Sequence, residues 1–343
     1  MIITRTPYRI SFFGGGTDYP AWYQEHGGQV LSATINRYSY VTCRDLPPFF
    51  EHKHRVVYSK LENVNSNAQL EHPVVRAIFD KFDIQSGLSI HHDGDLPAWS
   101  GIGSSSSFTV GLLQAVYAHQ GIHKSPHELS QEAIHIEQDI LQECVGCQDQ
   151  IAASYGGLNH TTIALGGAFE VKPVVVRPDK LQLLQDSLIL MYTGQKRFAS
   201  NFANAKVSNM PKRQMELREI QGMVSEAVAI LQSQQGSIEA FAKLLHEAWQ
   251  LKKRLADCVS NTEVDHIYEQ AIKQGTLGGK LCGAGGGGFM FFIVPPEKQS
   301  SFLEHFRSMV AFPVQFSQQG ASVIWHDYSS HKWGHSHVVG QCL

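Results

Sequence analysis

The chain has 343 residues, of which 43% are hydrophobic and 17% charged, and its formal net charge is −3. At roughly 100–200 residues per domain, this length predicts two domains, and the small net charge argues against broad electrostatic binding to nucleic acid or to an anionic membrane. The sequence has no apolar run of transmembrane length, and its first residues lack the apolar core of a signal peptide. Six scattered cysteines favour reduced thiols in a cytoplasmic protein over a disulfide framework.

Residues 8–19 are the first segment with a chemical pattern, and they predict a β-strand that runs into a glycine turn. The sequence is YRISFFGGGTDY. Arg9 stands in an otherwise apolar strand, which is costly unless the guanidinium has a partner. These residues alone support a buried structural ion pair and a functional arginine equally.

Strands are predicted over residues 30–43 and 88–92, and a helix is predicted over 104–119. The helix is opened by PAWSGIGSSSS, residues 97–107. A helix N-terminus offers free N–H groups and a positive dipole to an anion, and serine hydroxyls add donors or can coordinate Mg²⁺. A single serine would suffice to cap the helix, so the run of four predicts a phosphate-binding loop.

A second helix is predicted to begin after Ser125, where Glu128 completes a capping box. Its apolar stripe extends to Ile140, and Glu137 lies beside that stripe at the edge of the buried face. Asp149 follows in a predicted turn. An aspartate in a turn is usually only a turn residue, so its position alone does not indicate catalysis.

The second half begins near residue 185, where we place the domain boundary. It predicts a strand at 188–192, helices at about 212–233, 237–257 and 263–274, a glycine run, a strand at 289–294, a helix at about 297–309 and a last strand near 313–325. This pattern indicates an α+β fold. The tail, residues 328–343, contains His331, His335, His337 and Cys342. For this tail a polar, frayed terminus is favoured over a metal site.

The glycine run at 283–288, GAGGGG, matches the dinucleotide fingerprint G-x-G-x-x-G. That fingerprint has meaning only after a strand and before a helix. Here a helix is expected before the run and a strand after it, so we reject the dinucleotide-binding interpretation. The sequence also lacks the G-x-x-x-x-G-K-[ST] motif of P-loop proteins.

Taken together, three ordered segments resemble the GHMP kinases, a family named for galactokinase, homoserine kinase, mevalonate kinase and phosphomevalonate kinase. Residues 97–107 are similar to the phosphate loop of the family, residues 280–288 to its C-terminal glycine motif and residues 9–19 to its N-terminal substrate motif. The resemblance spans about residues 2–325. It implies an N-terminal domain like ribosomal protein S5 domain 2 (residues 1–185) and a ferredoxin-like C-terminal domain (residues 186–327), followed by the tail.

The resemblance also implies roles for individual residues in ATP-dependent phosphoryl transfer. Asp149 would act as the catalytic base beside Arg9, and Ser105 and Glu137 would hold Mg²⁺. The ATP phosphates would contact Pro97, Ser100, Gly101, Ile102, Gly103, Ser104, Ser105 and Ser106. The sugar would contact Gly14, Gly15, Gly16, Thr17, Asp18, Arg197, Gly285 and Gly286.

Within the family, residues 9–18 most resemble kinases of D-glycero-D-manno-heptose 7-phosphate, and residues 192–200 are similar to a segment of that subgroup. The implied activity is phosphorylation of the anomeric hydroxyl, on the route to nucleotide-activated heptose. The Lys196-Arg197 pair is a candidate for holding the phosphate of the sugar, and the basic run at residues 52–55 is a second candidate that we expect in a solvated loop. A kinase of an unphosphorylated sugar, such as fucose or galactose, is the alternative. A catalytically inactive ligand sensor is disfavoured by the presence of all the expected site residues.

Overall fold

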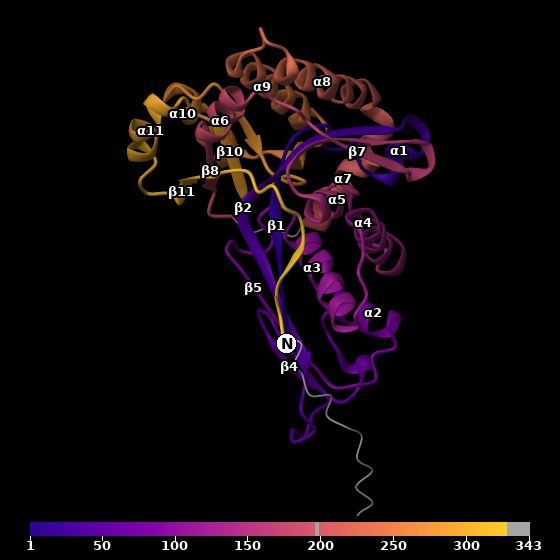
Figure 1. The fold of residues 1–343 in the computed structure, drawn as a ribbon. Coiled ribbons are helices and arrows are strands. Elements are labelled where there is room, and N and C mark those ends of the chain that lie inside the picture. The colour runs from indigo at the N-terminus through magenta and orange to yellow at the C-terminus, as the bar shows by residue number, and fades with distance from the viewer. Residues whose placement is uncertain (196–198, 328–343) are drawn as a thin grey trace, which may run out of the picture.

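The computed structural model describes residues 1–195 and 199–327, and in it the strands form two sheets (Figure 1). In the large sheet the strand order is β12-β1-β2-β5-β3-β4, with β6 pairing with both β2 and β7. The pairings are antiparallel except for the parallel pair of β3 and β5. The strands are β1 (Ile2–Phe13), β2 (Gly28–Asp45), β3 (His54–Val57), β4 (Leu61–Val64), β5 (Leu88–Gly94), β6 (Leu158–Ile163), β7 (Phe169–Pro173) and β12 (Ser322–His326).

Helices α3 and α5 of the first half pack on the large sheet. Helix α3 packs directly on β1 and β2, and α4 and α5 pack beside it. The helices of the first half are α1 (Pro20–His26), α2 (Pro73–Lys81), α3 (Ser104–His119), α4 (Pro126–Ile134) and α5 (Gln148–Tyr155). The predicted helix at 104–119 is confirmed residue for residue.

The capping box of the next helix is confirmed, because Ser125 accepts from the N–H of Glu128 and the Glu128 carboxylate reaches back to Ser125. Two predictions for that region were wrong. The helix continues from α4 as a π-helical turn, η2 (His135–Ile140), so Ile140 is rotated out of the apolar stripe and is 43% exposed. Asp149 lies in the first turn of α5, not in a turn between elements.

The second sheet has the order β11-β8-β10-β9 and is antiparallel. Numbered along the chain, this order is the 4-1-3-2 arrangement of a ferredoxin-like sheet, which confirms the predicted fold class. Its strands are β8 (Leu188–Tyr192), β9 (Gly278–Leu281), β10 (Phe289–Ile293) and β11 (Ala311–Pro313). The helices of this half are α6 (Pro178–Asp186), α7 (Ala199–Asn209), α8 (Gln214–Gln232), α9 (Ile238–Arg254), α10 (Thr262–Lys273) and α11 (Gln299–His305).

Three expectations for the second half need correction. Strand β9, not a helix, precedes the glycine run, although the rejection of a dinucleotide motif stands because β10 follows the run. The single strand expected near 313–325 is two strands, β11 and β12. The last of them, β12, pairs with β1 and so belongs to the large sheet. A chain segment assigned by sequence position to the second domain therefore completes the sheet of the first.

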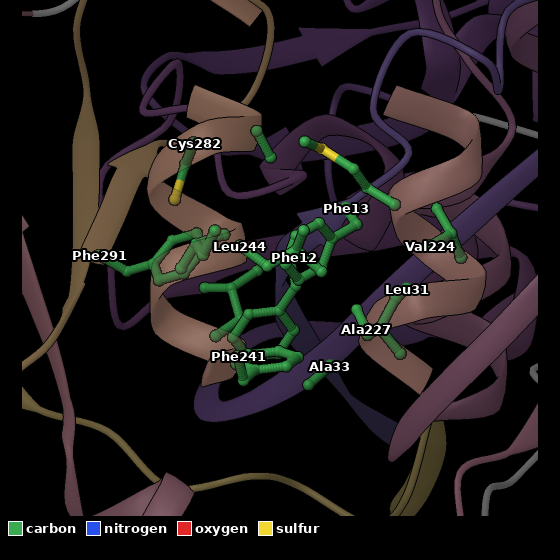
Figure 2. Close-up of a cluster of buried hydrophobic side chains, with 14 of the residues drawn as sticks. Phe12, Phe13, Leu31, Ala33, Val224, Ala227, Phe241, Leu244, Cys282 and Phe291 are labelled. Carbon is green, nitrogen blue, oxygen red and sulfur yellow. The ribbon is translucent and has the colours of Figure 1, made fainter. Parts of the chain in front are cut away.

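A shared aromatic core fixes the two halves against each other (Figure 2). Phe12 and Phe13 of β1 each lie 5.3 Å from the ring centroid of Phe241 on α9, and Phe12 lies 5.4 Å from Phe291 on β10. All four rings are buried, which stabilises the contact by about 2–3 kcal/mol for each side chain. Because β1 also carries Arg9, this core holds that side chain in register with the second half.

None of the helices in the described ranges combines the length and apolarity needed to cross a lipid bilayer.

Candidate active site

Arg9 and Asp149 form a bidentate ion pair at the centre of the candidate site. Nε of Arg9 donates to Oδ1 of Asp149 at 2.7 Å, and Nη2 donates to Oδ2 at 2.6 Å. The arginine side chain is 4% exposed, whereas that of Asp149 is 24% exposed. Burial lowers the pKa of Arg9, but the charge and hydrogen bonds of Asp149 outweigh burial and raise it, so the guanidinium stays charged. The carboxylate is thus both fixed and reachable from solvent.

Arg9 also connects this pair to the predicted phosphate loop. Its backbone N–H donates to the carbonyl of Ile102 at 3.1 Å, and its Nη1 donates to the carbonyl of Gly101 at 2.6 Å. The pairing of β1 with β2 shifts register between Pro7 and Arg9, an irregularity of the kind that re-aims a side chain. The arginine in the apolar strand therefore links strand β1 to the phosphate loop and to Asp149 by hydrogen bonds.

Helix α3 begins without a side-chain cap, because its N-cap residue is Gly103 in a left-handed conformation with φ of 76°. The four serines divide into two pairs. Ser106 and Ser107 are buried and donate to Glu137 and to the carbonyl of Pro7. Ser104 and Ser105 face outward, and Ser105 is exposed. The open N–H groups and two outward hydroxyls form an anion-binding helix start.

The phosphate loop lies directly against the C-terminal glycine run. A Cβ placed on Gly101 would lie 2.8 Å from the carbonyl oxygen of Cys282, and Gly101 has a φ of 82°, so both space and backbone conformation require glycine there. The carbonyl of Ser100, whose hydroxyl donates to Pro97, accepts from the N–H of Phe289 at 2.9 Å. Two motifs about 180 residues apart in the sequence thus pack backbone against backbone and share a hydrogen bond.

Glu137 lies fully buried beneath the start of α3, on the π-helical turn η2. Its Oε2 accepts from Ser106 at 2.8 Å and from Gln150. The Thr109 hydroxyl also favours the charged carboxylate but donates to the carbonyl of Ser105, so Oε1 has no partner of good geometry among the described residues. Burial raises the pKa of Glu137 to about 7. A buried carboxylate oxygen without a donor, beside hydroxyls at a phosphate loop, fits a divalent cation held by oxygen ligands. The hydroxyl that contacts Glu137 is that of Ser106, whereas sequence analysis paired this carboxylate with Ser105.

Asp18 is a second buried carboxylate, at the end of the glycine turn. Its Oδ1 accepts from the N–H of Gly16 at 2.8 Å, and burial raises its pKa. A Cβ on Gly146 would lie 1.8 Å from Oδ2 of Asp18, so only glycine fits beside the carboxylate. Thr17 contributes to the turn itself, since its hydroxyl donates to the carbonyls of Gly14 and Gln29.

Other predicted sugar contacts have different surroundings. Gly286 donates its N–H to the carbonyl of Val259, and Gly285 packs on the same residue, so both are held by the segment Asp257–Val259. Arg197 and the histidine-rich tail lie outside the described residues. The basic run at 52–55 is not simply a solvated loop, because His54 begins β3 and is fully buried.

Sequence analysis missed three buried lysines around the glycine run. Nζ of Lys252 donates to the carbonyls of Leu281 and Gly283 at 2.8 and 2.7 Å, and Nζ of Lys280 donates to the carbonyl of Phe12 at 3.0 Å. Lys206, on α7, interacts electrostatically with Asp18 and Asp149. Burial lowers the pKa of all three, that of Lys280 to about 8. Of the three, only Lys280 could have been found from the sequence, because it lies inside the glycine motif. Lys206 and Lys252 lie in helical segments where a lysine is expected to face solvent.

A cavity of about 510 Å³ borders the site between Tyr19 and Val207. Its lining includes the carboxylates of Asp139 and Glu143 and the amide of Gln138, and no lysine or arginine of the described chain. Such a lining suits hydroxyl groups better than it suits a phosphate.

Comparisons with known proteins show which family the chain resembles. Two family profiles match the chain: GHMP kinases N terminal domain over residues 69–157, and GHMP kinases C terminal over residues 227–311. The chain is 28% identical to D-glycero-alpha-D-manno-heptose 7-phosphate kinase from Campylobacter jejuni, over 92% of this chain and 96% of that protein. It is 24% identical to a galactokinase from Pyrococcus furiosus, over 83% of this chain and 86% of that protein.

A solved structure, described as a D-glycero-D-manno-heptose 1-phosphate kinase from Bacteroides thetaiotaomicron, has the same fold. It superimposes with a TM-score of 0.78 at 24% identity, over 96% of this chain and 100% of that chain. The chain therefore belongs to the GHMP kinases, a family of ATP-dependent kinases. Within that family it is a sugar kinase, a phosphotransferase with an alcohol group as acceptor.

Proposed function

We propose that this enzyme transfers the γ-phosphoryl group of ATP to the anomeric hydroxyl of D-glycero-D-manno-heptose 7-phosphate, and so serves the synthesis of nucleotide-activated heptose. The Arg9–Asp149 pair against the open start of α3 carries the proposal, because it sets a fixed carboxylate beside a phosphate-binding loop. The 28% identity to the Campylobacter jejuni heptose 7-phosphate kinase over nearly the whole chain supports the choice of sugar.

In this proposal Asp149 accepts the proton of the attacking hydroxyl. Two hydrogen bonds from Arg9 fix both oxygens of the carboxylate, so the group is held in place to accept a proton from a substrate hydroxyl. The same guanidinium reaches the loop through Gly101, so its charge also offsets charge on the transferring phosphoryl group. Phosphoryl transfer needs positioning and charge neutralisation more than covalent chemistry, and this arrangement provides both.

ATP would be held by the loop 97–103 and by the N–H groups at the start of α3, with the hydroxyls of Ser104 and Ser105 facing it. Glu137 and a serine hydroxyl would hold Mg²⁺, which supplies charge neutralisation at the phosphates when bound. The unpartnered Oε1 of Glu137 is the observation that supports this placement. Ionisation of Glu137, disfavoured by burial alone, is favoured by such a cation.

On the acceptor side, Asp18 would accept hydrogen bonds from sugar hydroxyls, and the glycine turn 14–16 would let the backbone approach the ring. The cavity between Tyr19 and Val207 gives the rest of the sugar a polar, hydroxyl-compatible wall. The 7-phosphate needs cations, and we assign that role to Arg197.

The second candidate is a kinase of an unphosphorylated sugar such as fucose or galactose. The absence of lysine and arginine from the described lining of the cavity favours it, as does the similarity to a galactokinase.

A substrate panel distinguishes the two candidates. The enzyme is incubated with ATP and Mg²⁺ and, in separate reactions, with D-glycero-D-manno-heptose 7-phosphate, the corresponding 1-phosphate, L-fucose and D-galactose, and the product is read by phosphorus NMR. We expect a new anomeric phosphate on the 7-phosphate sugar and a kcat/KM at least about tenfold above that for the neutral sugars, the effect of one charge-assisted contact. A preference for a neutral sugar would leave only the sugar-kinase assignment.

A further inference from the structure

Among the described residues, Lys206 differs from the other buried cations of the site because no protein group accepts a hydrogen bond from it. It lies on α7 and is 3% exposed. Lysine is almost never fully buried unless it is paired, because its ammonium has three N–H donors to satisfy. The other buried cations of the site follow this rule: Arg9 bonds Asp149 and Gly101, Lys252 bonds two carbonyls, and Lys280 bonds one.

The ammonium of Lys206 makes no ion pair and no side-chain hydrogen bond with any residue in the ranges 1–195 and 199–327. Its Nζ lies over the face of the Tyr19 ring, 4.4 Å from the centroid. A ring face attracts the charge but accepts no conventional hydrogen bond. Although the side chain as a whole is buried, Nζ is not among the fully buried unpartnered atoms, so its donors open onto accessible space without an oxygen partner among the described residues.

The charges around Lys206 define the space that it faces. The carboxylates of Asp18 and Asp149 favour its charged form, whereas burial and the charge of Arg9 disfavour it. Tyr19, which holds the ammonium, directly follows Asp18 in the chain and also lines the cavity beside the site. The ammonium thus lies over the ring of the residue that follows Asp18, and it interacts electrostatically with both carboxylates of the site, one from the glycine turn and one from the start of α5.

We propose that Lys206 is a substrate-positioning residue, whose ammonium donates hydrogen bonds to hydroxyl oxygens of the sugar acceptor between Asp18 and Asp149. This inference rests on the proposed function only in taking the acceptor to be a sugar. A hydroxyl both accepts and donates, so neighbouring hydroxyls of one sugar can accept from Lys206 and donate to Asp18. Such a pair recognises a diol, and an acceptor without these hydroxyls would leave the buried ammonium unpartnered.

The variant Lys206→Met tests the proposal, because methionine keeps the length and apolar stem of the side chain and removes the donors. Lys212→Met, an exposed lysine six residues further on, is the matched control. The readouts are KM for the acceptor, KM for ATP, kcat and the midpoint of thermal unfolding without substrates. The acceptor is whichever of the heptose 7-phosphate, L-fucose or D-galactose the wild-type enzyme phosphorylates, so failure of the heptose assignment does not alter this comparison.

We expect Lys206→Met to raise KM for the acceptor by about 10–100-fold, the range of a charge-assisted hydrogen bond, and to change KM for ATP by less than threefold. Thermal stability should stay equal or rise, because an unpaired buried charge is replaced by an apolar group. Lys206→Arg, which keeps charge and donors, should recover part of the lost acceptor affinity. The proposal is overturned if acceptor KM stays within threefold of wild type, if ATP KM rises in parallel, or if the midpoint falls without any effect on acceptor KM.

Discussion

The carboxylate of Asp149 receives both of its charged hydrogen bonds from a single guanidinium, that of Arg9, at 2.7 and 2.6 Å. The same guanidinium donates to the carbonyl of Gly101 at 2.6 Å. One side chain therefore sets the distance between the proposed base and the loop that would hold the phosphates. Any change that moves Arg9 displaces both.

Replacement of Asp149 by asparagine tests its role as a base, because the amide keeps the shape and loses the charge. We expect turnover to fall by at least about 10²-fold, the lower range for a positioned base, with little change in ATP affinity. Steady-state kinetics and ATP binding by calorimetry measure the two effects. Asp80→Asn, an exposed aspartate on α2, is the control. A variant of Asp149 within a factor of three of wild type would remove this residue from the mechanism.

Glu137→Gln tests the proposed Mg²⁺ site. The Mg²⁺ concentration for half-maximal activity should rise by at least about tenfold, since one anionic ligand becomes neutral. The free energy of unfolding should not fall, because burial disfavours the charge of Glu137 and raises its pKa to about 7. Magnesium titrations of activity and urea unfolding of the same samples give both values. Full activity of the wild-type enzyme in excess EDTA would contradict the assignment.

Arg197→Ala tests the phosphate end of the sugar. Arg197 lies outside the described residues, so its role remains a prediction from sequence. We expect KM for the sugar 7-phosphate to rise by about 10–100-fold, equivalent to the roughly 1.5–3 kcal/mol of a charge-assisted hydrogen bond. KM for ATP should barely change. Arg218→Ala, at an exposed position on α8, serves as the control, and an unchanged sugar-phosphate KM would argue against the 7-phosphate substrate.

Because His54 is buried, we expect the free energy of unfolding to fall in mild acid. Its Nδ1 accepts from the N–H of Leu88 at 3.3 Å, and burial lowers its pKa to about 4. The unfolded chain takes up this proton near pH 6.5 while the folded chain resists it, so the stabilisation is present above pH 6.5 and is lost as the pH falls to about 4. The loss should reach up to about 3 kcal/mol, since one pKa unit corresponds to about 1.4 kcal/mol.

Urea unfolding of wild type and His54→Gln at several pH values measures this term as the difference between the two curves. The wild-type curve should fall more steeply between pH 6.5 and 4, whereas His123→Gln, at an exposed histidine, should follow wild type. Parallel curves for wild type and His54→Gln would mean that His54 is protonated as readily in the folded protein as in the unfolded chain.

The sequence by itself determined those features whose signal is local. The start of α3 at Ser104, the capping box at Ser125 and Glu128, and the strand into the glycine turn each depend on residues within one or two turns of chain. The three glycine motifs and their order were sufficient to indicate the family and the α+β fold. Glycine gives a clear sequence signal because only glycine tolerates certain backbone conformations and close approaches. Gly101 is an example, since its φ is positive and a Cβ there would lie 2.8 Å from the carbonyl oxygen of Cys282.

Only the tertiary structure decided which residues meet. Arg9 and Asp149 are 140 positions apart, and nothing local to either one indicates the other. Glu137 meets Ser106 from a position 31 residues away, on the π-helical turn His135–Ile140, which the sequence pattern did not indicate and which leaves Ile140 exposed. Lys206 and Lys252 carry charges typical of solvated helix faces, and only packing of α7 and α9 against the glycine turns buries them. Neighbouring residues in the sequence determine whether a residue lies in a helix, strand or turn. Its burial and its ion-pair partners depend on contacts between segments far apart in the sequence.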